Sequence, residues 1–267
     1  MRTYARIEKA LGETPLLALE RFRKHEHIPS TVPLTYAGRL DPLASGKLLV
    51  LIGEECKQRA RYDGLDKKYI FEVLLGFKTD TGDVLGMVEE HSPPSVSESE
   101  VRAVAHSLVG KHSFPYPAFS SRTVNGKPLF QYALEKTLDT IEIPRTDVEI
   151  YSLTYIDRLI IPKERLIERI LDTIGLVKID MESKKLGADF RRDEISKRWW
   201  SLRSRHTTSC TILRFEATVS SGTYIRTLAP LIAERLGTQG LAYSIQRTRI
   251  GRYVSLTRFF GFWLHTF

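Results

Sequence analysis

The sequence has little cysteine. Its 267 residues include two cysteines, Cys56 and Cys210, which lie far apart and in no metal-ligand spacing. A disulfide framework and a cysteine-based zinc site are therefore not expected. The seven histidines also form no ligand pair at helical or hairpin spacing. We expect a protein of the reducing cytoplasm that holds no metal.

Long hydrophobic runs are missing as well. No apolar run approaches the roughly 18 residues of a membrane span, and the longest, residues 48–52, fits a buried strand. The charged N-terminus lacks the apolar segment of a secretory signal. We therefore expect no membrane partner for a chain whose 42% apolar content is that of an ordinary globular protein.

The sequence has fewer acidic than basic residues. Forty Lys and Arg against 32 Asp and Glu leave a net charge of +8, which favours a polyanionic partner, chiefly nucleic acid. Residues 183–206 hold eight Lys or Arg against three Asp or Glu, next to Trp199 and Trp200. Basic residues beside aromatic ones suit a nucleic-acid surface. The alternative is a solvated helical face with both tryptophans turned inward.

Strings typical of cofactor or protease sites fail on spacing or surroundings. Residues 46–47, Gly-Lys, end like a phosphate-binding loop but lack its first glycine and its hydroxyl residue. Residues 80–82, Asp-Thr-Gly, resemble half of an aspartic-protease dyad, yet their polar flanks, Asp83 among them, are those of a turn between strands. The sequence points to no cofactor.

Periodic patterns mix strands with helices. Alternating apolar residues predict strands at residues 69–75 and 214–221. Helical spacing predicts a helix from Val101 to Gly110 capped by Ser97 and Glu100, a helix at residues 162–174, and a helix at residues 228–236 with Pro230 in its first turn. Because strands and helices do not alternate regularly, the pattern favours an α+β fold.

Residues 36–46 read Tyr-Ala-Gly-Arg-Leu-Asp-Pro-Leu-Ala-Ser-Gly and place a lone acid, Asp41, in a proline-stiffened loop. Such an acid is either a turn residue or a catalytic group held by a rigid scaffold. The stretch resembles the catalytic motif of pseudouridine synthases. Residues 67–83, 126–129, 222–228 and, more weakly, 246–251 resemble segments of the TruB family in the family's order. That family modifies the T-loop uridine of tRNA, conventionally position 55.

The resemblance implies one catalytic domain over residues 1–267 with the pseudouridine-synthase fold, a mixed and largely antiparallel sheet with flanking helices and an RNA-binding cleft. It implies a cofactor-free isomerisation in which the N1 glycosidic bond breaks, the uracil turns and C5 is joined to the ribose. Asp41 corresponds to the catalytic carboxylate, either as nucleophile on C1′ or as base on C2′. Arg226 corresponds to the cation that keeps Asp41 ionised, and Tyr69 to the tyrosine that stacks on the base.

Further residues correspond to substrate-binding positions. Tyr224 shares a face with Arg226 if residues 222–226 are extended, and Ile245 matches an apolar residue beneath the base. The remaining substrate-binding candidates are Tyr36, which stands where many family members carry histidine, Arg39, Lys67 and Lys68. The implied partner is the T-arm of tRNA, bound by a monomer.

Two departures concern RNA binding. We expect no C-terminal PUA domain of the kind found in many relatives, and we expect residues 157–208 to form a basic helical insert where relatives have a short link. We expect the insert to replace the missing RNA contacts, so deleting residues 160–208 should flatten the salt dependence of tRNA affinity. The aromatic tail is expected to pack on the core; it comprises Phe259, Phe260, Phe262 and Trp263.

Two other functions stay open. Residues 38–41, Gly-Arg-Leu-Asp, look closer to the RluA and RsuA branches, which favours a synthase that acts on ribosomal RNA. The other alternative is a non-catalytic RNA-binding or RNA-folding protein on the same scaffold. Retention of Asp41, Tyr69 and Arg226 together argues against it, because binding alone needs no carboxylate facing an anionic backbone.

Overall fold

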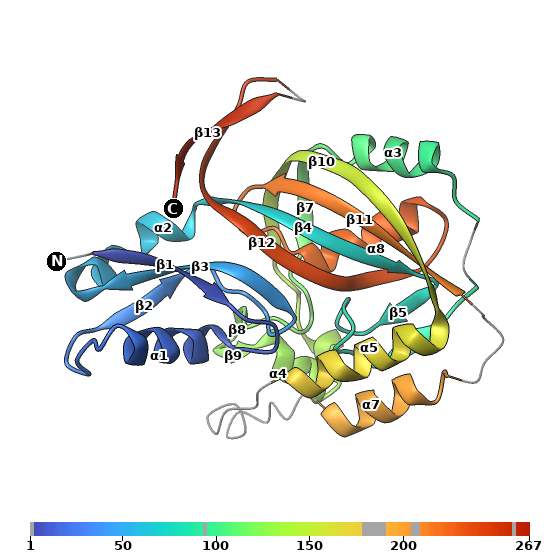
Figure 1. The fold of residues 1–267 in the computed structure, drawn as a ribbon, viewed down its shortest axis with the longest axis horizontal. Coiled ribbons are helices and arrows are strands. Elements are labelled where there is room, and N and C mark those ends of the chain that lie inside the picture. Colours follow the sequence, from blue (N-terminus) through green and yellow to red (C-terminus); the bar gives the residue numbers. More distant parts are fainter. Residues whose placement is uncertain (1–2, 93–94, 178–190, 204–208, 258–259) are drawn as a thin grey trace.

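The computed structural model describes residues 3–92, 95–177, 191–203, 209–257 and 260–267. Its centre is a mixed sheet in the order β1-β3-β12-β4-β11-β10-β7, with β2 on β3 and β13 on β12 (Figure 1). The strands are β1 (Tyr4–Lys9), β2 (Leu34–Ala37), β3 (Ala44–Ile52), β4 (Asp66–Leu75), β7 (Gly110–Pro115), β10 (Arg145–Pro162), β11 (Ser209–Val219), β12 (Gly240–Ser255) and β13 (Gly261–Thr266). Only the β3–β12 ladder is parallel among the described strands. The expected mixed, largely antiparallel α+β fold is confirmed.

Helices and short ribbons surround this sheet. The helices are α1 (Pro15–His25), α2 (Ala60–Asp63), α3 (Glu98–Ser107), α4 (Leu129–Leu134), α5 (Lys163–Leu176), α7 (Arg192–Trp200) and α8 (Ile225–Arg235), with 3₁₀ turns η1 (Gly53–Gln58) and η2 (Leu138–Thr140). The ribbons are β5 (Phe77–Thr79) with β6 (Val88–Glu90), and β8 (Thr123–Val124) with β9 (Lys127–Pro128). Helix α8 packs on β4 and β12, and α3 packs on β10. None of the described helices has the length and apolarity needed to span a membrane.

The core follows from the alternation in the central strands. Buried and partly exposed side chains alternate over residues 66–73 of β4 and 213–217 of β11, and the rings of Phe71 and Phe215 stack with centroids 5.6 Å apart. The cap predicted for α3 is present, because Ser97 Oγ accepts from the Glu100 N–H while the Glu100 carboxylate accepts from the Ser97 N–H. These elements hold a rigid sheet beneath the loops that form the site.

Helix α8 begins earlier than its sequence pattern suggests. We expected an extended chain through Arg226 with Pro230 in the first helical turn, but the helix starts at Ile225 and Pro230 lies inside it. Tyr224, which is extended (φ −97°, ψ 117°), is the N-cap. The proline removes one backbone bond, to the carbonyl of Arg226, and that carbonyl faces Gly82 instead. Arg226 therefore projects from the first turn of a helix.

Among its described residues, the expected insert at residues 157–208 is not purely helical. Residues 157–162 belong to β10 and pair with residues 209–214 of β11, so they extend the central sheet. The helices among the described residues of the insert are α5 and α7, which lie side by side below β5 in the view of Figure 1. Trp199 is fully buried, whereas Trp200 is 54% exposed. Residues 178–190 and 204–208 of the insert lie outside the described residues.

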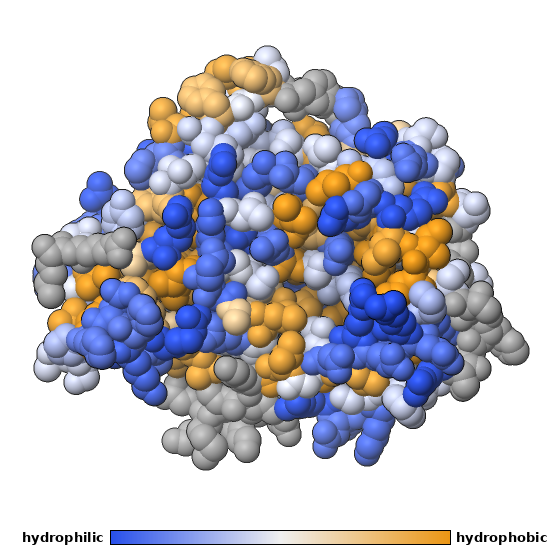
Figure 2. Space-filling model, viewed as in Figure 1, coloured by the Kyte–Doolittle hydropathy of each residue, from blue (hydrophilic) through white to orange (hydrophobic). Residues whose placement is uncertain are grey.

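The prediction that the aromatic tail packs on the core is wrong for two of its residues. Strand β13 pairs along the edge of β12, beyond the body of the sheet, and Figure 2 shows apolar side chains on this outlying hairpin. Phe260 and Phe262 are 64% and 45% exposed, while Trp263 contacts the ring of Tyr253 at 5.4 Å. Strand alternation sends these side chains to opposite faces, and only one face meets protein. Phe259 lies outside the described residues.

Candidate active site

A cavity of about 780 Å³ opens where the β2–β3 loop, the β5–β6 turn, residues 116–122 and the start of α8 meet. It is lined by almost all of the side chains singled out from the sequence: Tyr36, Arg39, Asp41, Lys67, Tyr69, Tyr224, Arg226 and Ile245. Lys68 is the exception, because strand alternation turns it to the other face of β4, where it forms an ion pair with Glu216 at 2.7 Å. The chain thus brings together residues that are up to 209 positions apart in sequence.

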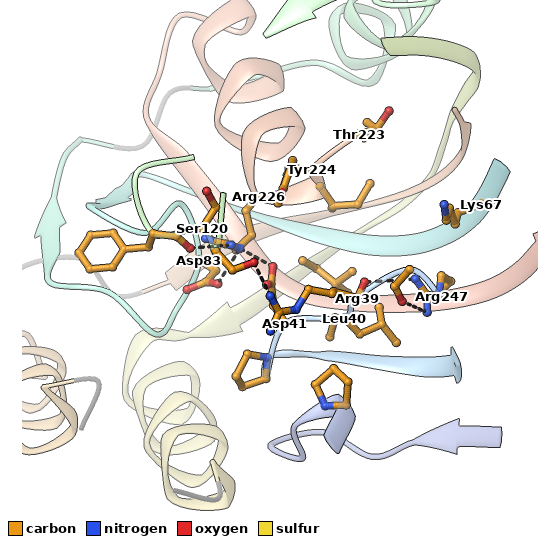
Figure 3. Close-up of a pocket in the computed structure, with 18 of the residues that line it drawn as sticks. Arg39, Leu40, Asp41, Lys67, Asp83, Ser120, Thr223, Tyr224, Arg226 and Arg247 are labelled. Atoms are coloured by element: carbon orange, nitrogen blue, oxygen red, sulfur yellow. Dashed lines mark hydrogen bonds and ion pairs between the residues drawn. The ribbon is translucent and has the colours of Figure 1, made fainter. Parts of the chain in front are cut away.

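Asp41 and Arg226 form the centre of the site. The Arg226 Nε donates to Asp41 Oδ2 at 2.7 Å, while its Nη1 and Nη2 donate to the carbonyls of Thr81 and Phe119 at 3.0 and 3.2 Å. Burial disfavours the charged guanidinium, but Asp41 and Asp83 more than offset it and raise the pKa of Arg226. Figure 3 shows Arg226 grouped with these two carboxylates. The guanidinium is therefore a fixed cation beside Asp41.

Asp83 is a site residue that our sequence reasoning missed. Its carboxylate is buried, lies 3.5 Å from Arg226 Nε and accepts from Thr81 Oγ1 and the Leu85 N–H at 2.8 and 2.9 Å. Burial raises the pKa of Asp83 to about 6, against the lowering effect of Arg226. The predicted turn at residues 80–82 is present, and Asp83 in its polar flank is buried. The sequence signal that could have indicated its burial is the order Gly-Asp-Val at residues 82–84, in which Asp83 stands between a turn glycine and an apolar residue.

Gly82 lets this turn approach Arg226. Its φ is +76°, and an added Cβ would lie 2.4 Å from the carbonyl oxygen of Arg226. We expect Gly82→Ala to destabilise the protein by at least about 2 kcal/mol and to lower activity, because left-handed backbone and a backbone clash are both unfavourable. Urea unfolding measures the loss. Gly64→Ala is the matched control, since Gly64 has an ordinary φ and open space around it; equal losses in the two variants would contradict the prediction.

Part of the cavity wall is aromatic and apolar. Tyr69 and Ile245, on the neighbouring strands β4 and β12, are 7% and 5% exposed. Burial raises the pKa of Tyr224, whose ring meets that of Tyr116 edge-on at 6.0 Å. The guanidinium of Arg122 lies over the Tyr116 ring at 5.1 Å. Such walls suit a flat base taken out of its stack.

Two buried cations line the cavity near the loop that carries Asp41, and one of them, Arg247, holds that loop. Arg247 is 1% exposed and donates to the carbonyls of Gly38, Arg39 and Lys47 at 3.1, 3.3 and 2.7 Å. Lys67 Nζ bonds the carbonyl of Leu65, and burial lowers the pKa of Lys67 to about 8. Figure 3 shows both at the opposite end of the cavity from Asp83. The sequence marked Arg247 only as part of a weak motif, so its loop-holding contacts were not foreseen.

Both carboxylates beside Arg226 border the cavity, but only that of Asp41 is substantially exposed. The Asp41 side chain is 37% exposed, whereas that of Asp83 is 5% exposed. A reacting group can therefore reach Asp41 but not Asp83. Within the described residues, no three His, Cys, Asp or Glu side chains are grouped to ligate a metal ion. The arrangement can deliver one carboxylate, held by a fixed cation, to a ligand in the cavity that Tyr69 and Ile245 line.

The comparisons with known families and with known sequences agree on one family. A family model described as TruB family pseudouridylate synthase (N terminal domain) matches residues 28–162. Among similar proteins, tRNA pseudouridine synthase B of Caldicellulosiruptor saccharolyticus is 32% identical over 151 residues, which cover 57% of this chain and 50% of the relative. The proteins of the same name from Chloroherpeton thalassium and Bacillus subtilis are 26% and 29% identical, and the matches cover 92% and 96% of this chain and 82% and 67% of theirs.

The chain spans about half the length of some of these relatives: the match covers 50% of the Caldicellulosiruptor protein and 55% of another tRNA pseudouridine synthase B.

Solved structures share the fold. A chain in the crystal structure of a Cbf5-Nop10-Gar1 complex has a TM-score of 0.55 at 15% identity, over 93% of this chain and 49% of that one. A chain of the archaeal box H/ACA sRNP Nop10-Cbf5 complex gives 0.51 at 15% identity, over 92% and 47%.

Proposed function

Because this chain belongs to the TruB family of pseudouridylate synthases, we propose that it isomerises uridine to pseudouridine in the T-loop of tRNA without a cofactor. The observation that carries the proposal is the 2.7 Å ion pair between Asp41 and Arg226 on the wall of a cavity that Tyr69 also lines. The names of its relatives support tRNA as the substrate. We propose that it acts as a monomer in the cytoplasm.

The site residues divide the chemistry between them. Asp41, the open carboxylate, attacks C1′ or takes the proton at C2′, and the N1–C1′ bond breaks. The uracil turns in the cavity that Tyr69 and Ile245 line, and stacking on the Tyr69 ring contributes on the order of 1–3 kcal/mol. C5 then bonds to C1′ as the Asp41–C1′ bond breaks or, if Asp41 acted as the base, as the proton returns from Asp41 to C2′. The proton on C5 leaves and N1 gains one, so the product is an isomer of the substrate and Asp41 is regenerated as a carboxylate. Arg226 stays protonated throughout and holds the Asp41 carboxylate in place.

Asp83 makes the stability of the protein depend on pH. The pKa of Asp83 rises from 3.8 to about 6 on folding, so between these values the folded chain binds more protons than the unfolded one. The free energy of unfolding of the wild type should therefore fall as pH rises through this window. Asp83→Asn lacks this titrating group. The difference in the free energy of unfolding between the wild type and this variant should therefore change by about 2–3 kcal/mol between pH 4 and 7. Urea unfolding across the range tests this, and parallel curves for the two proteins would contradict it.

The insert supplies cations that we propose bind RNA phosphates. Lys197 is exposed on α7, and Lys184 and Lys185 lie outside the described residues. Replacing all three by Ala should weaken tRNA binding and lower the slope of log affinity against log salt by about 2–3, since each lost phosphate contact removes about one counterion. Filter binding at several salt concentrations measures the slope. An unchanged slope would contradict the proposal.

The choice of RNA is tested by mapping. Unmodified tRNA and ribosomal RNA transcripts are incubated separately with the purified protein, and sequencing chemistry reports pseudouridine at each position. We expect modification confined to the T-loop uridine of tRNA. Modification of ribosomal RNA alone would replace this substrate by the alternative that residues 38–41 favour. Binding of either RNA without any product would point to a non-catalytic protein.

A further inference from the structure

The contacts of Arg226 identify two backbone segments whose spacing the active site depends on. One is the β5–β6 turn, which gives the Thr81 carbonyl, and the other is the loop of residues 117–122, which gives the Phe119 carbonyl. The guanidinium reaches both segments while it holds Asp41. If the two segments moved apart, the orientation of Arg226 would be lost. A group that holds the two segments from outside the cavity would keep Arg226 in this orientation.

Arg191, at the start of α7 in the insert, contacts the same two segments. Its Nη2 lies 2.7 Å from Asp80 Oδ2, next to Thr81 in the turn. Its guanidinium also lies 4.9 Å from the centre of the Phe119 ring, over its face. Arg191 does not line the cavity. It thus joins from outside the two segments that Arg226 joins from inside.

Helix α7 is fixed to the same turn along its length. The Trp199 indole N–H donates to the Val84 carbonyl at 3.0 Å, and Arg198 Nε donates to the Val88 carbonyl at 2.9 Å. Asp80 is in turn fixed to its own loop, because Asp80 Oδ1 accepts from the Met87 N–H at 2.8 Å. The base of the Arg191 contact is therefore rigid.

The backbone of Arg191 is held in a disfavoured conformation. Its φ of +46° and ψ of 34° lie in the left-handed region, and its side chain makes no capping bond to α7. A non-glycine residue remains there only when its surroundings over-determine it. Here the surroundings are the contacts with Asp80 and Phe119, which direct the side chain toward the site.

We propose that Arg191 is a positioning residue for the isomerisation, through which the insert holds the Asp80 turn and Phe119 together and so fixes the Arg226–Asp41 pair. The inference rests on the proposed function. It gives the insert a role in turnover distinct from RNA binding. A displacement of about 1 Å at a reacting group can cost a hundredfold in rate, so a contact outside the cavity can control the chemical step.

The test is a single-turnover measurement with protein in excess over tRNA, so that an inactive fraction does not lower the rate constant. We expect Arg191→Ala to lower this constant about 10- to 100-fold, while tRNA affinity and its salt slope stay unchanged. Arg191→Lys, which keeps the charge, should recover part of the loss. Arg192→Ala is the matched control, because Arg192 donates to the Gly175 carbonyl in α5 and contacts no part of the site.

A double-mutant cycle isolates the contact itself. Asp80→Asn keeps the acceptor for the Met87 N–H but loses the charge that faces Arg191. We expect the double variant to be no slower than the slower of the two single variants, because both substitutions remove the same contact between Arg191 and Asp80. Equal rate constants for Arg191→Ala, Arg192→Ala and wild type would overturn the proposal, as would additive losses or weakened tRNA binding with unchanged turnover. Absence of product with the wild type would instead refute the proposed function.

Discussion

Asp41→Asn is expected to lower the rate of uridine isomerisation at least about 1,000-fold, or about 4 kcal/mol in transition-state free energy. The amide has nearly the same shape and still accepts from Arg226 Nε, so the local fold should persist. It can neither attack C1′ nor remove a proton at C2′. Affinity for tRNA should stay within a few-fold, because phosphate contacts elsewhere dominate binding. Pseudouridine release assays and filter binding measure the two quantities.

Asp63→Asn is the control for this experiment. Asp63 also lines the cavity, but its carboxylate pairs with the exposed Arg59 rather than with Arg226. This variant should keep most of its activity. Comparable turnover by the Asp41 and Asp63 variants would mean that Asp41 is not the reacting carboxylate.

We expect Arg226→Ala to lower the free energy of unfolding by about 3–5 kcal/mol at neutral pH. Removing the guanidinium leaves Asp83 buried without a cation and leaves Asp41 without its ion-pair partner. The carbonyls of Thr81 and Phe119 also lose their hydrogen-bond donors. Activity should be lost with it. Arg226→Lys keeps the charge but not the fork of donors, so it should retain more stability than activity. Urea unfolding and single-turnover assays separate the two effects.

The double variant Arg226→Ala, Asp83→Asn provides the check. If the stability loss comes from an uncompensated buried charge, neutralising Asp83 should restore part of it, although the activity stays absent. A double variant as unstable as the sum of the two single ones would contradict this interpretation, because it would mean that Asp83 and Arg226 do not interact.

The sequence was most informative where periodicity or a motif coincides with one local structure. The alternation around Phe71 predicted β4, and the Ser97–Glu100 pair predicted the cap of α3. The loop around Asp41 and the segment around Arg226 could be placed together only through the family resemblance. Nothing local in either segment indicates that they meet 185 positions apart.

The residues that escaped prediction owe their roles to tertiary contacts. Asp83 looks like one polar residue of a turn, and its burial depends on α8 and β12 packing over it. Arg247 sits in a basic stretch, and only the fold points it at the Asp41 loop. The insert's basic composition suggested RNA, yet Arg191 and Arg198 face the β5–β6 turn. Composition gives the charge of a segment but not the direction in which its side chains point.

The most direct test is pseudouridine mapping at nucleotide resolution on one unmodified tRNA transcript, incubated in parallel with the wild type and with the Asp41 variant and without added metal or nucleotide. We predict one modified uridine, in the T-loop, in the wild-type reaction and none with the variant. Modification at the same position and rate by both proteins would contradict the assignment of Asp41. A transcript left unmodified by the folded, tRNA-binding wild type would contradict the function.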